Sequence, residues 1–217
     1  MSVQINYKNS FPKKNSANIV FFVDENFNIK SLKKYISNTE FSYLSDLLKT
    51  SDLKKKLLIF EISSKKKIIL VSIKKDLQTS GVENLGAELY GNINNAKKSD
   101  YLINTDTINS KIENFIGHLL HGLKLKSYVF DKYKTKKENK LITINLFGKK
   151  NKLSGRDQLK FEALEKGTFY TRDLVSEPGN VLHPDEYAKR ISSLKKNGLK
   201  IKIYNDKKLK KLGMNAL

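Results

Sequence analysis

The sequence predicts an α/β fold in which a mixed sheet is covered by helices. Along the first 150 residues, short runs rich in Val, Ile and Phe alternate with segments whose apolar residues recur every three or four positions. This alternation of strand and helix patterns is typical of α/β sheets. The chain has no cysteine, which excludes disulfides and thiolate metal sites. No run is apolar for long enough to cross a bilayer, so we expect a cytoplasmic protein that does not span the membrane.

Six segments have the character of strands. They are rich in β-branched or aromatic residues and are bounded by polar residues. The polar stretch Ser63–Lys67 separates two of them so closely that we expect a hairpin or another tight connection there. The predicted strands are Val3–Tyr7, Ala17–Val23, Lys56–Ile62, Ile68–Ile73, Asp100–Asn104 and Leu141–Phe147.

Helical spacing marks the segments between these strands. The clearest case is Ile108–Leu123, whose apolar residues form a wide stripe along one side of a helix. Gly81–Ala96 has the same type of spacing, and two shorter helices are predicted at Ile29–Tyr35 and Phe41–Leu48.

A second part of the chain is predicted to follow the segment Gly148–Gly155, which is rich in lysine and glycine and has little to bury. Ser154 with Asp157 three residues later forms a pattern that caps a helix amino terminus. We therefore expect a helix over Gly155–Glu177. Its predicted apolar face contains Leu159, Ala163, Gly167, Tyr170 and Leu174, and Gly167 indicates close packing against another element.

Beyond this helix the sequence predicts a helix over Pro184–Lys196, a strand over Lys200–Tyr204 and a short helix over Asp206–Gly213. The chain is therefore expected to contain two domains, residues 1–150 and residues 151–217. The second domain would be a helix–helix–strand–helix unit.

The net charge of +20 raises the question of a nucleic-acid partner. Of the 42 basic residues only Arg156, Arg172 and Arg190 are arginine, the residue that best recognises phosphates and bases. The lysines are spread along the whole chain. This pattern favours a generally basic surface, with a DNA-binding module as the alternative.

The three histidines are the first candidates for metal chemistry. His118 and His121 lie three residues apart on a predicted helix and can approach one metal ion. They flank an apolar stripe, however, and no nearby carboxylate pattern completes a set of ligands, which favours a structural role. His183 precedes Pro184 at a predicted helix start, where imidazole is a weaker cap than a hydroxyl group.

The segment Arg172–Leu182 reads RDLVSEPGNVL and is predicted to end a helix in a turn. Pro178 stops the helix, and Gly179 and Asn180 readily adopt left-handed conformations. Glu177, Pro178, Gly179 and Asn180 are a candidate catalytic loop, but an architectural turn is the favoured interpretation. We interpret Arg172 and Asp173 as an ion pair rather than an acid–base couple.

No phosphate-binding loop is present in the sequence. Neither of the glycine motifs that cradle nucleotide phosphates occurs. Gly81, Gly86 and Gly91 are spaced by five residues within a helical pattern, which does not form such a loop.

Three segments resemble the leucyl aminopeptidase family. The first is RDLVSEPGNVL, which resembles the family's R-D-L-V-N-E-P-[AG]-N-V-L segment, with Ser176 in place of asparagine. The second is Gly122–Lys137, GLKLKSYVFDKYKTKK, which is similar to G-x-x-L-G-x-Y-x-F-D-x-Y-K-T. The third is Lys211–Leu217, KLGMNAL, which resembles the start of L-G-M-G-A-L-L-A-V-G.

This resemblance implies a macro-domain-like amino-terminal domain followed by the start of a catalytic domain. It implies hydrolysis of amino-terminal residues from peptides by two divalent metal ions, manganese or zinc, in a homo-hexamer. The family's metal ligands lie downstream of the segment that matches Lys211–Leu217. We therefore assign no catalytic, cofactor-binding or metal-ligating residue to this chain, and we expect the chain alone to be an inactive fragment.

Two further implications concern binding. The family often has a V-G-L-G turn where this chain has Val71–Lys74 without glycine, which weakens the idea of a small ligand there. Some bacterial members bind DNA, so a basic DNA-binding module remains one alternative function. Assembly through the helix Gly155–Glu177 is another.

Overall fold

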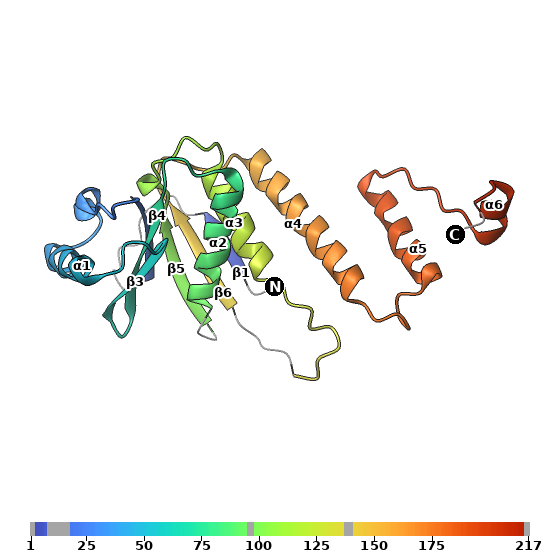
Figure 1. The fold of residues 1–217 in the computed structure, drawn as a ribbon, viewed down its shortest axis with the longest axis horizontal. Helices are drawn as coiled ribbons and strands as arrows, with labels where there is room; N and C mark the ends of the chain where they lie inside the picture. The colour runs from blue at the N-terminus through green and yellow to red at the C-terminus, as the bar shows by residue number, and fades with distance from the viewer. Residues whose placement is uncertain (1–2, 8–17, 95–97, 137–140, 215–217) are drawn as a thin grey trace. The chain divides into compact units, whose positions relative to one another are not determined.

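A six-stranded mixed sheet lies at the centre of the amino-terminal part of the chain (Figure 1). The computed structural model describes residues 3–7, 18–94, 98–136 and 141–214. The strand order is β1-β6-β5-β2-β4-β3, and every neighbouring pair is parallel except the hairpin of β3 and β4. All six strands predicted within residues 1–150 are present, with bounds shifted by two residues at most. They are β1 (Val3–Tyr7), β2 (Asn18–Asp24), β3 (Leu57–Ser63), β4 (Lys66–Ile73), β5 (Lys98–Asn104) and β6 (Leu141–Phe147).

Helices cover both faces of this sheet, so its inner strands are apolar on both sides. The helices α2 (Thr79–Ile93) and α3 (Phe115–Lys126) pack on one face, against Val20 and Phe22 of β2. The short helix η1 (Lys30–Lys34) and α1 (Asn38–Thr50) pack on the other face, against Phe21. The predicted mixed α/β fold is therefore confirmed.

The helices α2 and α3 approach each other closely at two glycines. A Cβ atom at Gly86 would collide with the backbone carbonyl oxygen of Leu119. A Cβ atom at Gly122 would collide with the backbone carbonyl oxygen of Glu83. Glycine is therefore required at both positions by helix packing rather than by a phosphate ligand.

The predicted start of α3 is wrong by seven residues. The helix begins at Phe115, and Asn114 before it has a left-handed φ of 52°. Ile108 is buried and Ile112 packs against the same core, but both do so from irregular backbone. Both residues are apolar because they pack against this core, and their sequence spacing happens to match that of a helical stripe.

The long helix α4 (Gly155–Ser176) begins where the capping pattern predicts. The Ser154 hydroxyl oxygen accepts the Asp157 backbone N–H at 3.1 Å. The predicted packing face is only partly correct. Leu174 is buried as predicted, but Phe161 and Glu165 are buried as well, and Leu159 is 67% exposed. A Cβ atom added at Gly167 would have no neighbour within 4 Å among the described residues.

The chain divides into two compact units, Met1–Phe169 and Tyr170–Leu217. The second unit contains α5 (Pro184–Ser192), the short helix η3 (Ser193–Asn197) and α6 (Asp206–Lys211), none of which has a buried residue. The predicted strand Lys200–Tyr204 is wrong, because these residues have no regular structure. No helix in the described ranges is long and apolar enough to span a membrane.

Candidate functional site

Two adjoining cavities lie where β1, β5 and β6 end, below the first turns of α4. The first has a volume of about 210 Å³ and the second about 230 Å³, and both are lined by Tyr7, Leu153 and Gln158. In open α/β sheets, ligands bind at the carboxyl ends of the strands. We therefore take these cavities as the candidate site. The first is also lined by Thr105, Ile116, Leu146, Phe147, Gly148, Asn151 and Lys152, and the second by Ile5, Gly117, Leu120, Lys124, Phe161, Glu162 and Glu165.

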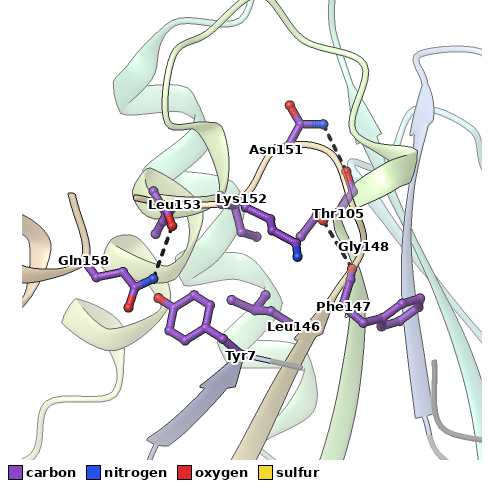
Figure 2. Close-up of a pocket in the computed structure, with 10 residues that line it drawn as sticks. Tyr7, Thr105, Leu146, Phe147, Gly148, Asn151, Lys152, Leu153 and Gln158 are labelled. Carbon is purple, nitrogen blue, oxygen red and sulfur yellow. Dashed lines mark hydrogen bonds between the residues drawn. The ribbon is translucent and has the colours of Figure 1, made fainter. Parts of the chain in front are cut away.

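The rim of the first cavity is a loop held by hydrogen bonds to the end of β5 (Figure 2). The Asp106 carboxylate accepts the backbone N–H groups of Lys149 and Lys150, both at 2.7 Å. The Thr105 hydroxyl donates to the Lys150 carbonyl at 2.7 Å. Gly148 has a φ of 138°, and a Cβ atom there would collide with the Thr105 hydroxyl oxygen. The loop is thus fixed against the end of β5.

The wall of the first cavity is largely apolar. Leu146 faces the core beneath α2 and α3, whereas Phe147 belongs to the core on the opposite side of the sheet (Figure 2). The Gln158 side-chain amide donates to the Leu153 carbonyl at 3.2 Å, and the Tyr7 hydroxyl points toward this amide. The polar groups of Tyr7 and Gln158 therefore lie where the two cavities adjoin.

The second cavity contains a partly buried charged cluster. The Lys124 ammonium donates to one oxygen of Glu165 at 2.6 Å, and the Glu165 side chain is 8% exposed. The other carboxylate oxygen of Glu165 lies 4.0 Å from Nδ1 of His121. Burial raises the pKa of Glu165 above its ordinary value, and Lys124 only partly offsets this effect. Burial also raises the pKa of the Tyr7 hydroxyl, and the negative charge of Glu165 contributes to this rise.

Phe161 anchors the first half of α4 beside this cluster. Its ring occupies the space that a side chain at position 117 would fill, because a Cβ atom at Gly117 would collide with it. The ring of His118 meets it edge-on at 4.9 Å between centroids, and the ring of His121 lies at 5.9 Å. Two histidines, one glycine and the Lys124–Glu165 ion pair thus hold α4 against α3.

The two helical histidines do not form a metal centre in this structure. His118 Nδ1 lies 3.0 Å from a carboxylate oxygen of Glu83, and His121 lies beside Glu165 instead. Among residues 3–7, 18–94, 98–136 and 141–214, no group of three or more His, Asp or Glu side chains can hold a metal ion. The donor set required for a two-metal centre is therefore not met by the described residues.

Sequence reasoning did not find these two carboxylate partners. Glu83 lies 35 residues before His118, and Glu165 lies 41 residues after Lys124. Neither separation is a local motif, so only the packing of α2 and α4 on α3 brings the groups together.

An ion pair between Glu177 and Arg190 anchors the start of the predicted turn at residues 177–180. The Glu177 side chain is 1% exposed and accepts a hydrogen bond from the Arg190 guanidinium at 2.8 Å. The prediction of left-handed conformations at Gly179 and Asn180 is wrong, because neither residue has a positive φ. The Pro178 carbonyl accepts the N–H groups of the two residues that follow Asn180, both at 2.9 Å.

The neighbouring predicted residues lie as follows. His183 occupies the N-cap position of α5 but makes no side-chain capping bond, and Pro184 opens that helix. Arg172 and Asp173 lie in the last turns of α4. Their ion pair, and the architectural role of the turn, remain predictions.

The comparison with known families gives a match over more than half of the chain. A family model described as the amino-terminal domain of the cytosol aminopeptidase family matches residues 19–137. A probable cytosol aminopeptidase of Agrobacterium fabrum is 40% identical over 102 residues, which are 44% of this chain and 20% of the relative. One from Phytoplasma mali is 37% identical over 114 residues, 52% of this chain and 23% of the relative. These matches span less than a quarter of each relative.

Solved structures show the same fold. A mutant of tomato leucine aminopeptidase has a TM-score of 0.71 at 16% identity, covering 97% of this chain and 46% of that one. The cytosol aminopeptidase of Coxiella burnetii has a TM-score of 0.63 at 15% identity, covering 94% and 41%. The bottromycin maturation enzyme BotP, solved in complex with Mn, has a TM-score of 0.64 at 13% identity, covering 92% and 40%.

Proposed function

Because the chain belongs to the cytosol aminopeptidase family, we propose that it supplies the non-catalytic amino-terminal domain of an enzyme that hydrolyses amino-terminal residues from peptides. The observation that carries this proposal is the match of residues 19–137 to that domain of the family. The α/β fold that the chain shares with leucine aminopeptidase structures supports it. The matches described above are to proteins named as aminopeptidases or as a maturation enzyme, so they give no support to the DNA-binding alternative.

The proposed amino-terminal domain covers residues 1–150 and is macro-domain-like, and residues 151–217 begin the catalytic part. Five mutually parallel strands with helical layers on both faces support the macro-domain-like description. The end of the last strand at Phe147 and the start of α4 at Gly155 support a boundary between them.

The activity, its metal ions and its assembly are proposals about the complete enzyme. We place two divalent ions, manganese or zinc, outside the described residues, since no group of His, Asp or Glu side chains within these residues fits a metal ion. BotP, a structural neighbour, is named in complex with Mn, which supports a divalent metal. We also propose a homo-hexamer, a cytoplasmic location and peptide substrates for the complete enzyme, and the same family membership supports these proposals.

Hydrolysis of leucine amide tests the proposal that this chain alone lacks catalysis. The purified 217-residue chain is incubated with Mn²⁺ or Zn²⁺, and the complete Coxiella burnetii cytosol aminopeptidase is assayed under the same conditions as the positive control. We expect turnover by the control only. Metal-dependent turnover by the chain, abolished by a chelator, would refute the proposal.

A further inference from the structure

We propose that the two adjoining cavities form a binding site for a small zwitterion with an aliphatic side chain, of which free L-leucine is the simplest example. The site lies entirely within residues of β1, β6, α3, the first half of α4 and the loops beside them. The inference goes beyond the proposed function and does not depend on it.

The cluster at Glu165 indicates that the charged end of the ligand is an ammonium group bound in the second cavity. Lys124 occupies one carboxylate oxygen of Glu165, and the other oxygen lies 4.0 Å from His121, which is longer than a hydrogen bond. A carboxylate accepts several hydrogen bonds, and a primary ammonium group supplies three donors. An ammonium group in the cavity would therefore stabilise the ionised form of a carboxylate that burial disfavours.

The first cavity would hold the aliphatic side chain of the ligand. Ile116, Leu146 and Leu153 line it, and all three side chains are buried. An aliphatic side chain placed there would remove its own surface from water, which is favourable by about 25 cal/mol per Å². Tyr7, Leu153 and Gln158 line both cavities, so one ligand can reach from the apolar wall to the charged cluster.

The charges restrict the class of ligand further. The Glu165 carboxylate in the second cavity would attract an ammonium group and repel the phosphate of a nucleotide, so a single amino acid is favoured over a nucleotide. Lys124 lines the second cavity and provides a cation for the carboxylate, which is bonded to the same carbon as the ammonium group.

Isothermal titration of the full 217-residue chain with four compounds tests this assignment. L-leucine has the ammonium group, the carboxylate and the aliphatic side chain that the site requires. N-acetyl-leucine lacks the ammonium group, glycine lacks the aliphatic side chain, and adenosine monophosphate represents a nucleotide. We expect leucine to bind at least about tenfold more tightly than each of the other three, a difference of about 1.4 kcal/mol. Equal binding of N-acetyl-leucine, or preference for the nucleotide, would overturn the proposal, as would no binding of leucine at millimolar concentration.

Variants locate the binding. Glu165→Gln should weaken leucine binding about tenfold or more, because the substitution removes the buried negative charge. The matched control is Glu61→Gln, since the Glu61 side chain is 70% exposed, pairs with Lys67 and lines neither cavity. Its affinity for leucine should equal that of the original chain, and an equal loss in both variants would contradict the role of Glu165.

A second variant keeps the test valid if Glu165→Gln unfolds the chain. Gln158 is only half-buried and lies where the two cavities adjoin, so Gln158→Trp should fill the site without disturbing the core. Circular dichroism confirms the fold of this variant. Loss of leucine binding supports the location, and unchanged binding refutes it.

Discussion

Alanine at Gly86 and alanine at Gly91 should change the stability of this protein in opposite directions. Both glycines lie in α2, five residues apart, and the chemical change is one methyl group in each case. A Cβ atom at Gly86 would collide with the Leu119 carbonyl oxygen and would lie 2.9 Å from the Leu123 backbone nitrogen. A Cβ atom at Gly91 would have no neighbour within 4 Å among the residues that the structure describes.

The expected magnitudes follow from two competing effects. Alanine is favoured over glycine in a helix by up to about 1 kcal/mol, which is the whole effect at Gly91. Overpacking costs about 1–3 kcal/mol. At Gly86 the cost should lie at the upper end, because the obstructing atoms belong to the α3 backbone and no side-chain rotation can relieve the contact. Gly86→Ala should therefore lower the free energy of unfolding by about 2 kcal/mol net.

Urea unfolding followed by circular dichroism measures this difference. For a chain of this size, 1 kcal/mol corresponds to a shift of about 2–4 °C in Tm, so thermal unfolding provides a second measurement. We expect Gly86→Ala to melt several degrees below the original chain and Gly91→Ala to melt slightly above it. A Gly86→Ala variant as stable as Gly91→Ala would show that α2 and α3 do not approach as closely as the structure indicates.

Three further predictions concern buried anchors. Phe161→Ala should lower stability by about 3–5 kcal/mol and speed hydrogen exchange in α4, because the ring is 6% exposed. Glu40→Gln should cost about 3 kcal/mol at pH 7, because the Glu40 carboxylate forms a buried ion pair with Lys66 at 2.5 Å. Arg190→Met should speed hydrogen exchange over α5, because it removes the guanidinium that binds the buried carboxylate of Glu177; unchanged exchange would contradict this.

The Glu40 prediction includes a dependence on pH. Burial alone would raise the pKa of Glu40, but hydrogen bonds from Lys66 and Ser37 outweigh it and hold the pKa below the ordinary value of 4.5. A lowered pKa in the folded state means that the ion pair contributes its full stability above the unfolded pKa. This contribution is lost as the pH falls below about 4.5 through the folded pKa. Acid titration of unfolding should therefore be flatter for Glu40→Gln, and identical slopes would contradict the assignment.

The strands and most of the helices could be predicted because their signals are local. A β-branched run such as Ile68–Ile73 contains its own information, and the ends of α4 follow from Ser154 at one end and Pro178 at the other. The start of α3 could not be predicted, because Ile108 and Ile112 are apolar for tertiary reasons and happen to continue the helical spacing.

Local sequence patterns could not predict the candidate site. The packed face of α4 is defined by Phe161 and by a charged residue, Glu165, which a search for apolar stripes places on the solvent side. Glu165 is buried only because Lys124, 41 residues earlier, lies opposite it. No property of the sequence around either residue identifies that pairing.

The position of β1 has a consequence for folding during synthesis. Among the described strands its only partner is β6, and the side-chain amides of Asn6 and Asn145 that meet across this pair are 139 residues apart in the chain. At about 5–20 residues per second, a ribosome needs roughly 7–28 s to synthesise the intervening segment. During that interval the first strand has no partner to pair with, while β2, β3 and β4 can already associate. The first strand to be made is therefore among the last to join the sheet, so slower translation between the two strands would lengthen the time in which β1 is exposed to chaperones or to aggregation.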